Sequence, residues 1–259
     1  LIREFEDKYP DRSVLPNNPA LNFINFVLED FGDEWCTKFM FHYRWHFDED
    51  ADNAGTILPL GINSNLKDDE LAFFKEHFAK RQIDRLWVVG SNSDTANLID
   101  QSYKRYLSLM EKHLKYLPFM FGQRPSSSDF ALYGQLTQLV GFDPTPRNIA
   151  YQISPRTVSW VNVMSDLSGL HDSGGIGEFF GVQSKKKDNN KLNYFEDDDY
   201  GWIDTNNIPD SLIEIFNELA TSPISLSVLG KNSCNGGSNN LTVTGKPFII
   251  LKISIKSFF

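Results

Sequence analysis

Five residues with aromatic or imidazole side chains follow one another at helical spacing near the start of the chain. They are Trp35, Phe39, His42, Tyr43 and His46. Four of them are separated by four, three and four positions, which places their side chains on one helical face, with Tyr43 beside them. Such a face can hold a flat apolar molecule and offer hydrogen-bond donors to charge that develops on it. The alternative is that the same rings form part of a hydrophobic core.

Three side chains in this stretch could in principle bind a metal or act as a nucleophile. His42 and His46 stand four positions apart, which lets two imidazoles share a metal ion. The residues between them are Tyr, Arg and Trp, so the glutamate of the zinc-protease motif is missing and no third ligand is evident. We therefore predict no metal site. Cys36 is expected to be a small buried apolar residue rather than a nucleophile, because the sequence fixes no cationic neighbour.

Two glycine-containing segments fail the requirements of nucleotide-binding motifs. Gly175-Ile176-Gly177 has Phe180 where a dinucleotide fingerprint needs its third glycine. Gly230-Lys231 is followed by Asn232, not by the Ser or Thr of a phosphate-binding loop. Neither segment predicts a nucleotide site.

The aromatic face requires a long helix, and the apolar pattern predicts one over residues 20–43. Asn18 can cap this helix, and Pro19 suits its first turn. Further helices are predicted over 68–82, 95–117 and 210–219, from about Ser127, and at Thr145-Pro146 and Ser154-Pro155, where Pro takes the first helical position. An all-α fold follows.

The segment from Phe119 to Leu136 contains the most specific helix start. Ser126 is followed three positions later by Asp129, directly before an apolar run, which is the pattern of a capping box. The Ser126 hydroxyl can accept from the backbone of the first turn, and the Asp129 carboxylate can reach back to the cap. Gly122 is expected to form a tight turn before this helix.

Residues 171–207 mix a glycine cluster, a basic run and an acidic run without sustained periodicity, and we expect a long surface loop there. The tail from Ser222 changes to an alternating pattern without acidic residues. It forms either a hairpin or a divergent end that packs poorly.

Several of these segments, in this order, resemble the helical domain of cytosolic glutathione transferases of bacteria. Ser126 to Leu136 is similar to the buried core helix of that domain, and Pro19 to Phe47 is similar to its long opening helix. Residues 3–18 resemble the last helix and linker of the family's thioredoxin-like domain. Phe142 to Pro146 and Ser154 to Gly169 are similar to the helices that follow.

The resemblance implies that glutathione activation and electrophile binding belong to different domains. In these enzymes the residue that activates glutathione, the cis-proline loop and the acidic-Ser turn lie in the thioredoxin-like domain, which would precede Leu1. We therefore expect the chain to be a fragment without a catalytic residue and without conjugating activity of its own. Glutathione is the expected co-substrate of the full-length protein, either for conjugation to an electrophile or for reduction of a peroxide or disulfide, and a homodimer is implied.

The resemblance also implies roles for the long helix. Its aromatic face would form the wall of a hydrophobic pocket for a small electrophile, and Asp30 and Asp33 are candidates for holding the glutathione amine of a neighbouring subunit. Lys38 and Arg44 are expected to project to solvent or to pair with Asp30, Asp33 or Glu34.

Composition limits the possible partners. The chain has 259 residues, 41% of them hydrophobic, and a net charge of -9. This acidic balance argues against nucleic acid and against an anionic membrane surface. Only two cysteines are present, Cys36 and Cys234, and no apolar run approaches the roughly 18 residues that span a bilayer. We expect a soluble cytoplasmic protein.

The sequence thus predicts four regions: 1–18, the end of a thioredoxin-like domain and linker; 19–170, the helical domain; 171–207, the loop; and 208–259, a helix and divergent tail. Two other interpretations stay open. The chain could be a non-catalytic module of the same family that serves binding or assembly, or an all-α protein whose likeness to the family is accidental.

Overall fold

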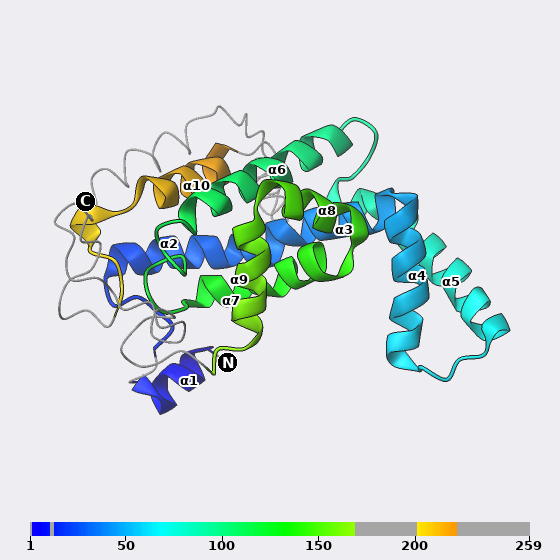
Figure 1. Ribbon diagram of the computed structural model, residues 1–259, viewed down its shortest axis with the longest axis horizontal. Helices are drawn as coiled ribbons and strands as arrows, with labels where there is room; N and C mark the ends of the chain where they lie inside the picture. The colour runs from blue at the N-terminus through cyan, green and yellow to red at the C-terminus, as the bar shows by residue number, and fades with distance from the viewer. Residues whose placement is uncertain (1, 11–12, 169–200, 222–259) are drawn as a thin grey trace, which may run out of the picture. The chain divides into compact units, whose positions relative to one another are not determined.

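The computed structural model describes residues 2–10, 13–168 and 201–221. Within these ranges regular structure is helical, and β pairing is limited to two isolated bridges, Phe119 with Gly122 and Gly122 with Trp202 (Figure 1). The predicted all-α fold class is confirmed for the described part of the chain. The alternating tail from Ser222, Gly175-Ile176-Gly177 and Gly230-Lys231 lie outside it.

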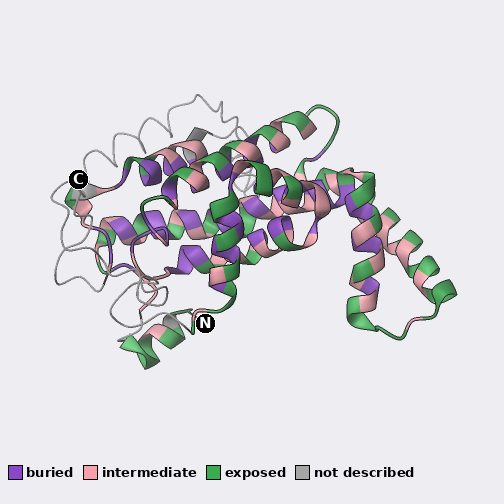
Figure 2. Cartoon of the chain, viewed as in Figure 1, coloured by how far each residue is buried: buried purple, intermediate pink, exposed green. Residues whose placement is uncertain are grey.

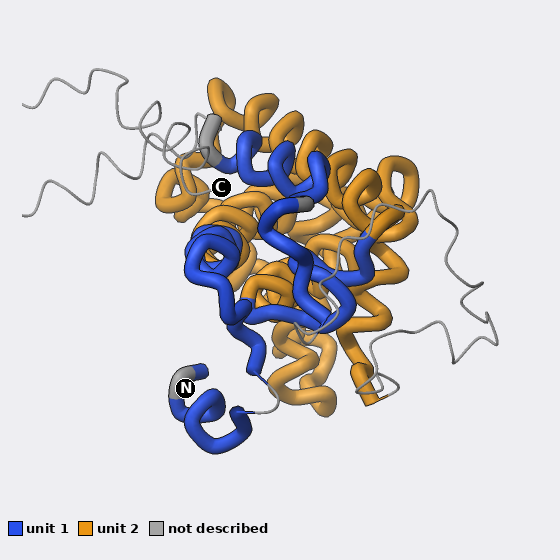
Figure 3. The backbone as a smooth tube through the Cα atoms, turned by 90° about the vertical axis from the view of Figure 1, so that its left-hand side faces the viewer, with its two compact units in different colours: residues 1–28, 117–127, 169–259 blue, residues 29–116, 128–168 orange. Residues whose placement is uncertain are grey.

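The chain divides into two compact units (Figure 3). The first comprises residues 1–28, 117–127 and 169–259, and the second comprises residues 29–116 and 128–168. The candidate residues from Asp30 to His46 belong to the second unit, whose elements are considered by themselves below.

The long opening helix is present, but it is not uniform. Helix α2 (Pro19–Asp30) passes into a π-helical segment, η2 (Phe31–Cys36), and then into α3 (Thr37–His46). The predicted cap is confirmed, since Asn18 Oδ1 accepts from the backbone of Ala20 at 2.9 Å. The π segment holds one extra residue per turn, so side chains before and after it do not keep the register of a regular α-helix.

Gly32, within η2, lets another helix of the second unit approach the long helix closely. A Cβ atom at Gly32 would lie 2.8 Å from the carbonyl carbon of Ala131 and 2.9 Å from the backbone nitrogen of Leu132, both in α7 (Ser127–Leu136). Real Cβ atoms do not come that close to backbone, so only glycine fits. Helix α7 begins at Ser127 as predicted.

Two helices that the pattern predicts are confirmed with changed boundaries. Helix α6 (Ala96–His113) ends four residues before the predicted 117, because the chain tightens into a turn in which Tyr116 N donates to His113 O at 3.0 Å. Helix α8 (Pro144–Ile153) begins at Asp143-Pro144, two residues before the predicted Thr145-Pro146. Both pairs combine a cap-forming residue with proline, so the sequence alone offers two equivalent starts.

The remaining helix starts are closer to expectation. Helix α9 (Pro155–Ser165) is capped by Ser154, whose Oγ accepts from Thr157 N at 3.3 Å, as predicted. Helix α5 (Asp68–Ile83) matches the predicted 68–82. Helix α4 (Asp48–Ile62), which the sequence analysis did not predict, forms a hairpin with α5. The short segment η3 (Leu86–Val89) follows α5 and contacts α3.

The first unit contains α1 (Ile2–Lys8), α10 (Asp210–Thr221) and the two bridges. In α10 Ile215 is buried while Ile213 is 43% exposed, so Ile215 belongs to the inward face of the helix and Ile213 does not. Two residues at the end of the predicted surface loop, Trp202 and Ile203, are also buried, which corrects that part of the loop prediction. Residues 169–200 lie outside the described ranges.

Backbone pairing explains why Trp202 and Ile203 are buried. Ile203 N donates to Phe121 O and Gln123 N donates to Gly201 O, each at 2.9 Å. Between them Gly122 takes a φ of +145°, and a Cβ there would lie 2.0 Å from the Gly201 oxygen. The tight turn predicted at Gly122 is confirmed, and this close approach is the reason for it.

Candidate functional site

Three of the five predicted aromatic-face residues lie in the interior of the second unit. Phe39 is 4% exposed, while His42 and Tyr43 are fully buried. Phe39 and Tyr43 both contact the ring of Tyr103 in α6, with ring centroids 5.9 and 5.1 Å apart. For Phe39 and Tyr43 the core alternative therefore describes the observed packing.

The other two residues are accessible. His46 is exposed, and its ring stacks on that of His42 with centroids 4.6 Å apart and an interplanar angle of 22°. Trp35 is half-buried, and the Lys38 ammonium lies 4.4 Å from its ring centroid. Because Trp35 belongs to the π segment, the spacing argument that aligned it with Phe39 and His42 does not hold across η2.

Only one of the two ring nitrogens of His42 has a hydrogen-bond partner among the described residues. Its Nδ1 lies 2.8 Å from the Ser91 hydroxyl, and its Nε2 has no hydrogen-bond partner among the residues that the structure describes. Burial lowers the pKa of His42 to about 4, with a further contribution from His46 and an opposing one from Asp100. The imidazole is therefore neutral at neutral pH.

Tyr43 is locked as a hydrogen-bond donor. Its hydroxyl donates to Asp100 Oδ1 at 2.8 Å, and Lys104 Nζ lies 2.7 Å from the other oxygen of the same carboxylate. Burial raises the pKa of Tyr43, and the hydrogen bond to Asp100 adds to the shift. The phenol stays protonated at neutral pH and provides no anion there.

Arg44 corrects one of the sequence predictions. It neither projects to solvent nor pairs with Asp30, Asp33 or Glu34; it is 7% exposed and binds Asp143, the N-cap of α8. Both Asp143 oxygens accept from its guanidinium at 2.9 Å, and its Nη2 also donates to Gln138 Oε1 at 2.9 Å. The guanidinium carbon lies 4.6 Å from the ring centroid of Phe142. This is a bidentate pair of the strong, geometrically specific kind.

A second buried carboxylate lies in the same region. Asp50, in the first turn of α4, is fully buried, and its Oδ1 accepts from Thr145 N at 2.9 Å. Its Oδ2 has no partner within the described residues. Burial raises the pKa of Asp50 and also that of Asp143, although hydrogen bonds from Thr145 and Arg44 respectively oppose the shift.

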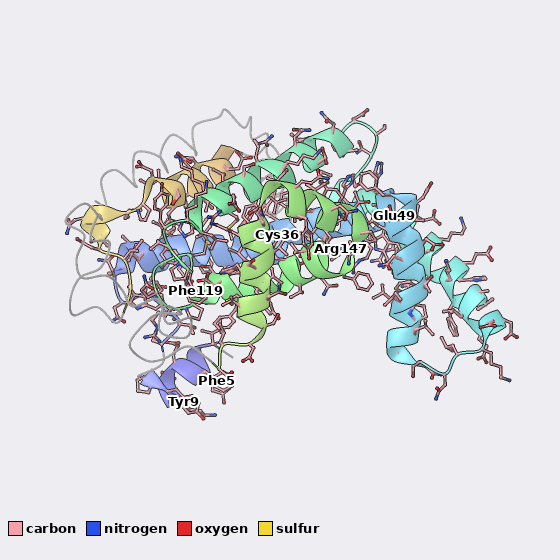
Figure 4. The ribbon with its side chains drawn as sticks, viewed as in Figure 1. Phe5, Tyr9, Cys36, Glu49, Phe119 and Arg147 are labelled. Carbon is pink, nitrogen blue, oxygen red and sulfur yellow. The ribbon has the colours of Figure 1, made fainter. Side chains whose placement is uncertain are left out.

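The remaining predicted residues are placed as follows. Asp30 and Asp33 are exposed. Cys36, labelled in Figure 4, is fully buried, and burial raises the pKa of its thiol, so the prediction of a buried apolar role is confirmed. Ser126 and Asp129 are both buried, while the cap hydrogen bonds proposed for them stay a prediction.

Sequence reasoning missed most of the polar residues that surround the aromatic face. These are Ser91, Asp100, Gln138, Asp143 and Asp50. Each has at least one partner that is distant in sequence; Arg44 and Asp143, for example, are 99 positions apart. Only the Asp143-Pro144 helix start carried a local signal, and it competed with Thr145-Pro146.

Comparisons with protein-family models, with curated proteins and with solved structures found no match. Among the described residues, no group of three or more His, Cys, Asp or Glu side chains is arranged to hold a metal ion. None of the helices in the described ranges is both long enough and apolar enough to cross a bilayer.

Proposed function

We propose that this chain is the helical part of a glutathione transferase-like protein, and that its long helix binds a small apolar electrophile. In the reaction of such a protein the thiolate of glutathione forms a bond to the electrophilic carbon, and a leaving group such as chloride departs with the electron pair. The helical part would position the electrophile on His46. A homodimer belongs to the same proposal.

One observation carries the proposal: an accessible imidazole is backed by a buried one at the end of α3. The His46 ring is exposed and stacks on His42, whose position is fixed by Ser91. A flat apolar ligand packs well on such a preorganised ring. Trp35 is also accessible, but it lies eleven positions before His46 on the same long helix, too far for one small ligand to contact both rings.

The buried groups support the assignment of catalysis to another part of such a protein. Thiol activation at neutral pH needs a base or a strong donor beside the sulfur. The pKa of Cys36 and that of Tyr43 are both raised by burial, so neither supplies a base at neutral pH, and the Tyr43 hydroxyl already donates its proton to Asp100. We therefore expect the chain to bind an electrophile without turning it over.

Calorimetric titration with an aryl halide such as chlorodinitrobenzene tests the proposal. His46→Ala should weaken binding about fivefold, the effect of one aromatic contact, whereas Trp35→Ala, about 16 Å away along the helix, should weaken it less. Trp87→Ala is the matched control, because Trp87 is 73% exposed in η3 and lies outside the proposed face. Equal affinity in all four proteins would refute the binding face. Conjugation of glutathione by this chain alone would refute the assignment of catalysis to another domain.

A second candidate is a non-catalytic binding or assembly module. The specific observation that favours it is the exposed apolar surface of α5, where Phe73 is 57% and Phe74 is 47% exposed. Retention on immobilised glutathione of the full-length protein, in which a thioredoxin-like domain would precede this chain, would favour the transferase, whereas free passage of that protein would favour the module.

A further inference from the structure

The α4–α5 hairpin carries an apolar surface on its outer side. In α5, which is described throughout, no residue is buried (Figure 2). Lys75 and Ala79 lie on the side of α5 that faces α4. A Cβ at Gly55 of α4 would lie 3.1 Å from Lys75 Cγ and 3.6 Å from Ala79 Cβ. The opposite side presents Phe73, Phe74 and His77 to solvent.

These three rings form an ordered cluster. The rings of Phe73 and His77 have centroids 3.9 Å apart, and Phe74 packs edge-on against Phe73 at 5.9 Å. His77 Nδ1 lies 2.9 Å from the Phe73 carbonyl oxygen, which can only accept, so Nδ1 donates. Rings that are already fixed lose little entropy when a partner covers them.

Helix α5 is acidic at its N-terminal end and basic at its C-terminal end. The first turn holds Asp68, Asp69 and Glu70, and the last turn holds Lys80 and Arg81. The rings lie between these ends. Glu70, Phe74, His77 and Arg81 are separated by four, three and four positions and therefore share one helical face.

An antiparallel copy of the same helix is complementary to this face. If a two-fold axis passes between Lys75 and Glu76, Phe74 stands level with His77 of the second copy. Glu70 then stands level with Arg81 of the second copy, and each pair occurs twice. Symmetric dimers use one self-complementary patch in this way.

We propose that the outer face of α5 is a self-association surface that pairs with α5 of a second copy of this chain in antiparallel orientation. Charge complementarity selects this occupant, because the acidic and basic ends of one helix meet the basic and acidic ends of the other. The surface is independent of the proposed electrophile face on the long helix. Failure of self-association would therefore leave the proposed electrophile binding intact and would remove only the homodimer from the proposed function.

Sedimentation equilibrium over a range of concentrations measures the association. Phe74→Ala should weaken dimerisation about 30-fold, because an aromatic anchor is lost twice in each dimer. Tyr151→Ala is the matched control, since Tyr151 is a 60% exposed aromatic residue on α8 of the same unit. It should leave association unchanged.

Charge reversal tests the register. The Arg81→Glu variant would bring two glutamates together at each paired position, and the Glu70→Arg variant would bring two arginines together there. Each variant alone should therefore dimerise about tenfold more weakly. Mixed in equal amounts, the two variants should form a heterodimer, because every charge pair is then opposite in sign. Glu70 also accepts from Lys67 N at 3.0 Å, so circular dichroism of both variants checks that α5 still forms.

Three outcomes would overturn the proposal: a chain that stays monomeric at every concentration, dimerisation unaffected by Phe74→Ala, or charge variants that do not restore each other. Monomeric behaviour would leave the face for a different partner. Electrophile titration of Phe74→Ala separates the proposals, since unchanged affinity is expected there.

Discussion

Two regions of the second unit combine charged and aromatic side chains in opposite settings. Around α3, the Arg44 and Asp143 side chains are 9% and 0% exposed, and both oxygens of Asp143 are bonded. On the outer side of α5, the pair of Lys80 and Asp84 is 75% and 62% exposed, with nitrogen and oxygen 3.5 Å apart. The same kinds of group therefore have different energetic consequences.

The energetic difference between the two ion pairs comes from burial. An exposed ion pair contributes about 0 to 1 kcal/mol, because water and salt screen it. Removing one partner of a buried pair leaves an uncompensated charge and costs about 3 to 5 kcal/mol. We therefore expect the α3 region to determine folding and the α5 face to determine association.

The largest expected effect comes from breaking the buried pair. Arg44→Met should lower the free energy of unfolding by about 3 to 5 kcal/mol, because the Asp143 carboxylate loses its partner in the interior. Urea denaturation followed by circular dichroism measures this change. The double variant Arg44→Met/Asp143→Asn should recover part of the loss, since no charge is then left unpaired. A cost below about 1 kcal/mol for Arg44→Met would mean that the pair is not buried as described.

His42 should make the same region sensitive to acid. Its pKa is about 4 in the folded protein and 6.5 ordinarily, so between these values the unfolded chain binds more protons. Stability is therefore retained above about pH 6.5 and lost as pH falls toward 4, by up to about 3 kcal/mol. The raised pKa values of Asp50 and Asp143 act in the opposite direction.

A variant isolates the contribution of His42. His42→Phe removes this titration and leaves the carboxylates in place, so its unfolding free energy should fall less between pH 7 and pH 4.5 than that of the parent protein. Urea denaturation at both pH values measures the difference. Equal falls in the two proteins would show that His42 is not responsible.

Two glycines offer a matched test of packing in the two regions. At Gly32 a Cβ would meet the α7 backbone at 2.8 Å, whereas at Gly61, in α4 of the hairpin, nothing lies within 4 Å. Gly32→Ala should destabilise by about 2 kcal/mol through overpacking. Gly61→Ala should stabilise by up to about 1 kcal/mol, because alanine is the better helix former. Thermal unfolding of both variants checks the signs; the same sign in both would contradict the difference in packing.

The two regions also differ in how far their sequence predicts them. Helix α5 was predicted nearly to the residue from the helical spacing of Leu71, Phe74 and Phe78, although Phe74, which this pattern puts on the apolar face, is 47% exposed. Helix α4 was missed, since Gly55, Pro59 and Gly61 interrupt the apolar pattern that would announce a helix. In the structure the helix nevertheless continues through Pro59 to Ile62.

The candidate site was less predictable than the helices. Local spacing correctly placed Phe39 and His42 on one helix, but it could not detect the π segment that changes the register of Trp35. The partner of Arg44 is 99 positions away and is set by tertiary packing. A single sequence contains no local signal for such a contact, so the expectation that Arg44 faces solvent failed.

The smallest expected effect is that of Phe74→Ala on the stability of the monomer. Phe74→Ala should change the free energy of unfolding of the monomer by less than about 0.5 kcal/mol, because an exposed side chain loses little burial on truncation. The urea midpoint at a protein concentration low enough to keep the chain monomeric measures this, with Phe39→Ala as the buried reference, for which a loss of about 3 to 5 kcal/mol is expected. A large loss for Phe74→Ala would mean that its ring supports the hairpin itself. In that case its effect on association would reflect folding, and only the exchange of charges between Glu70 and Arg81 would still test the antiparallel pairing.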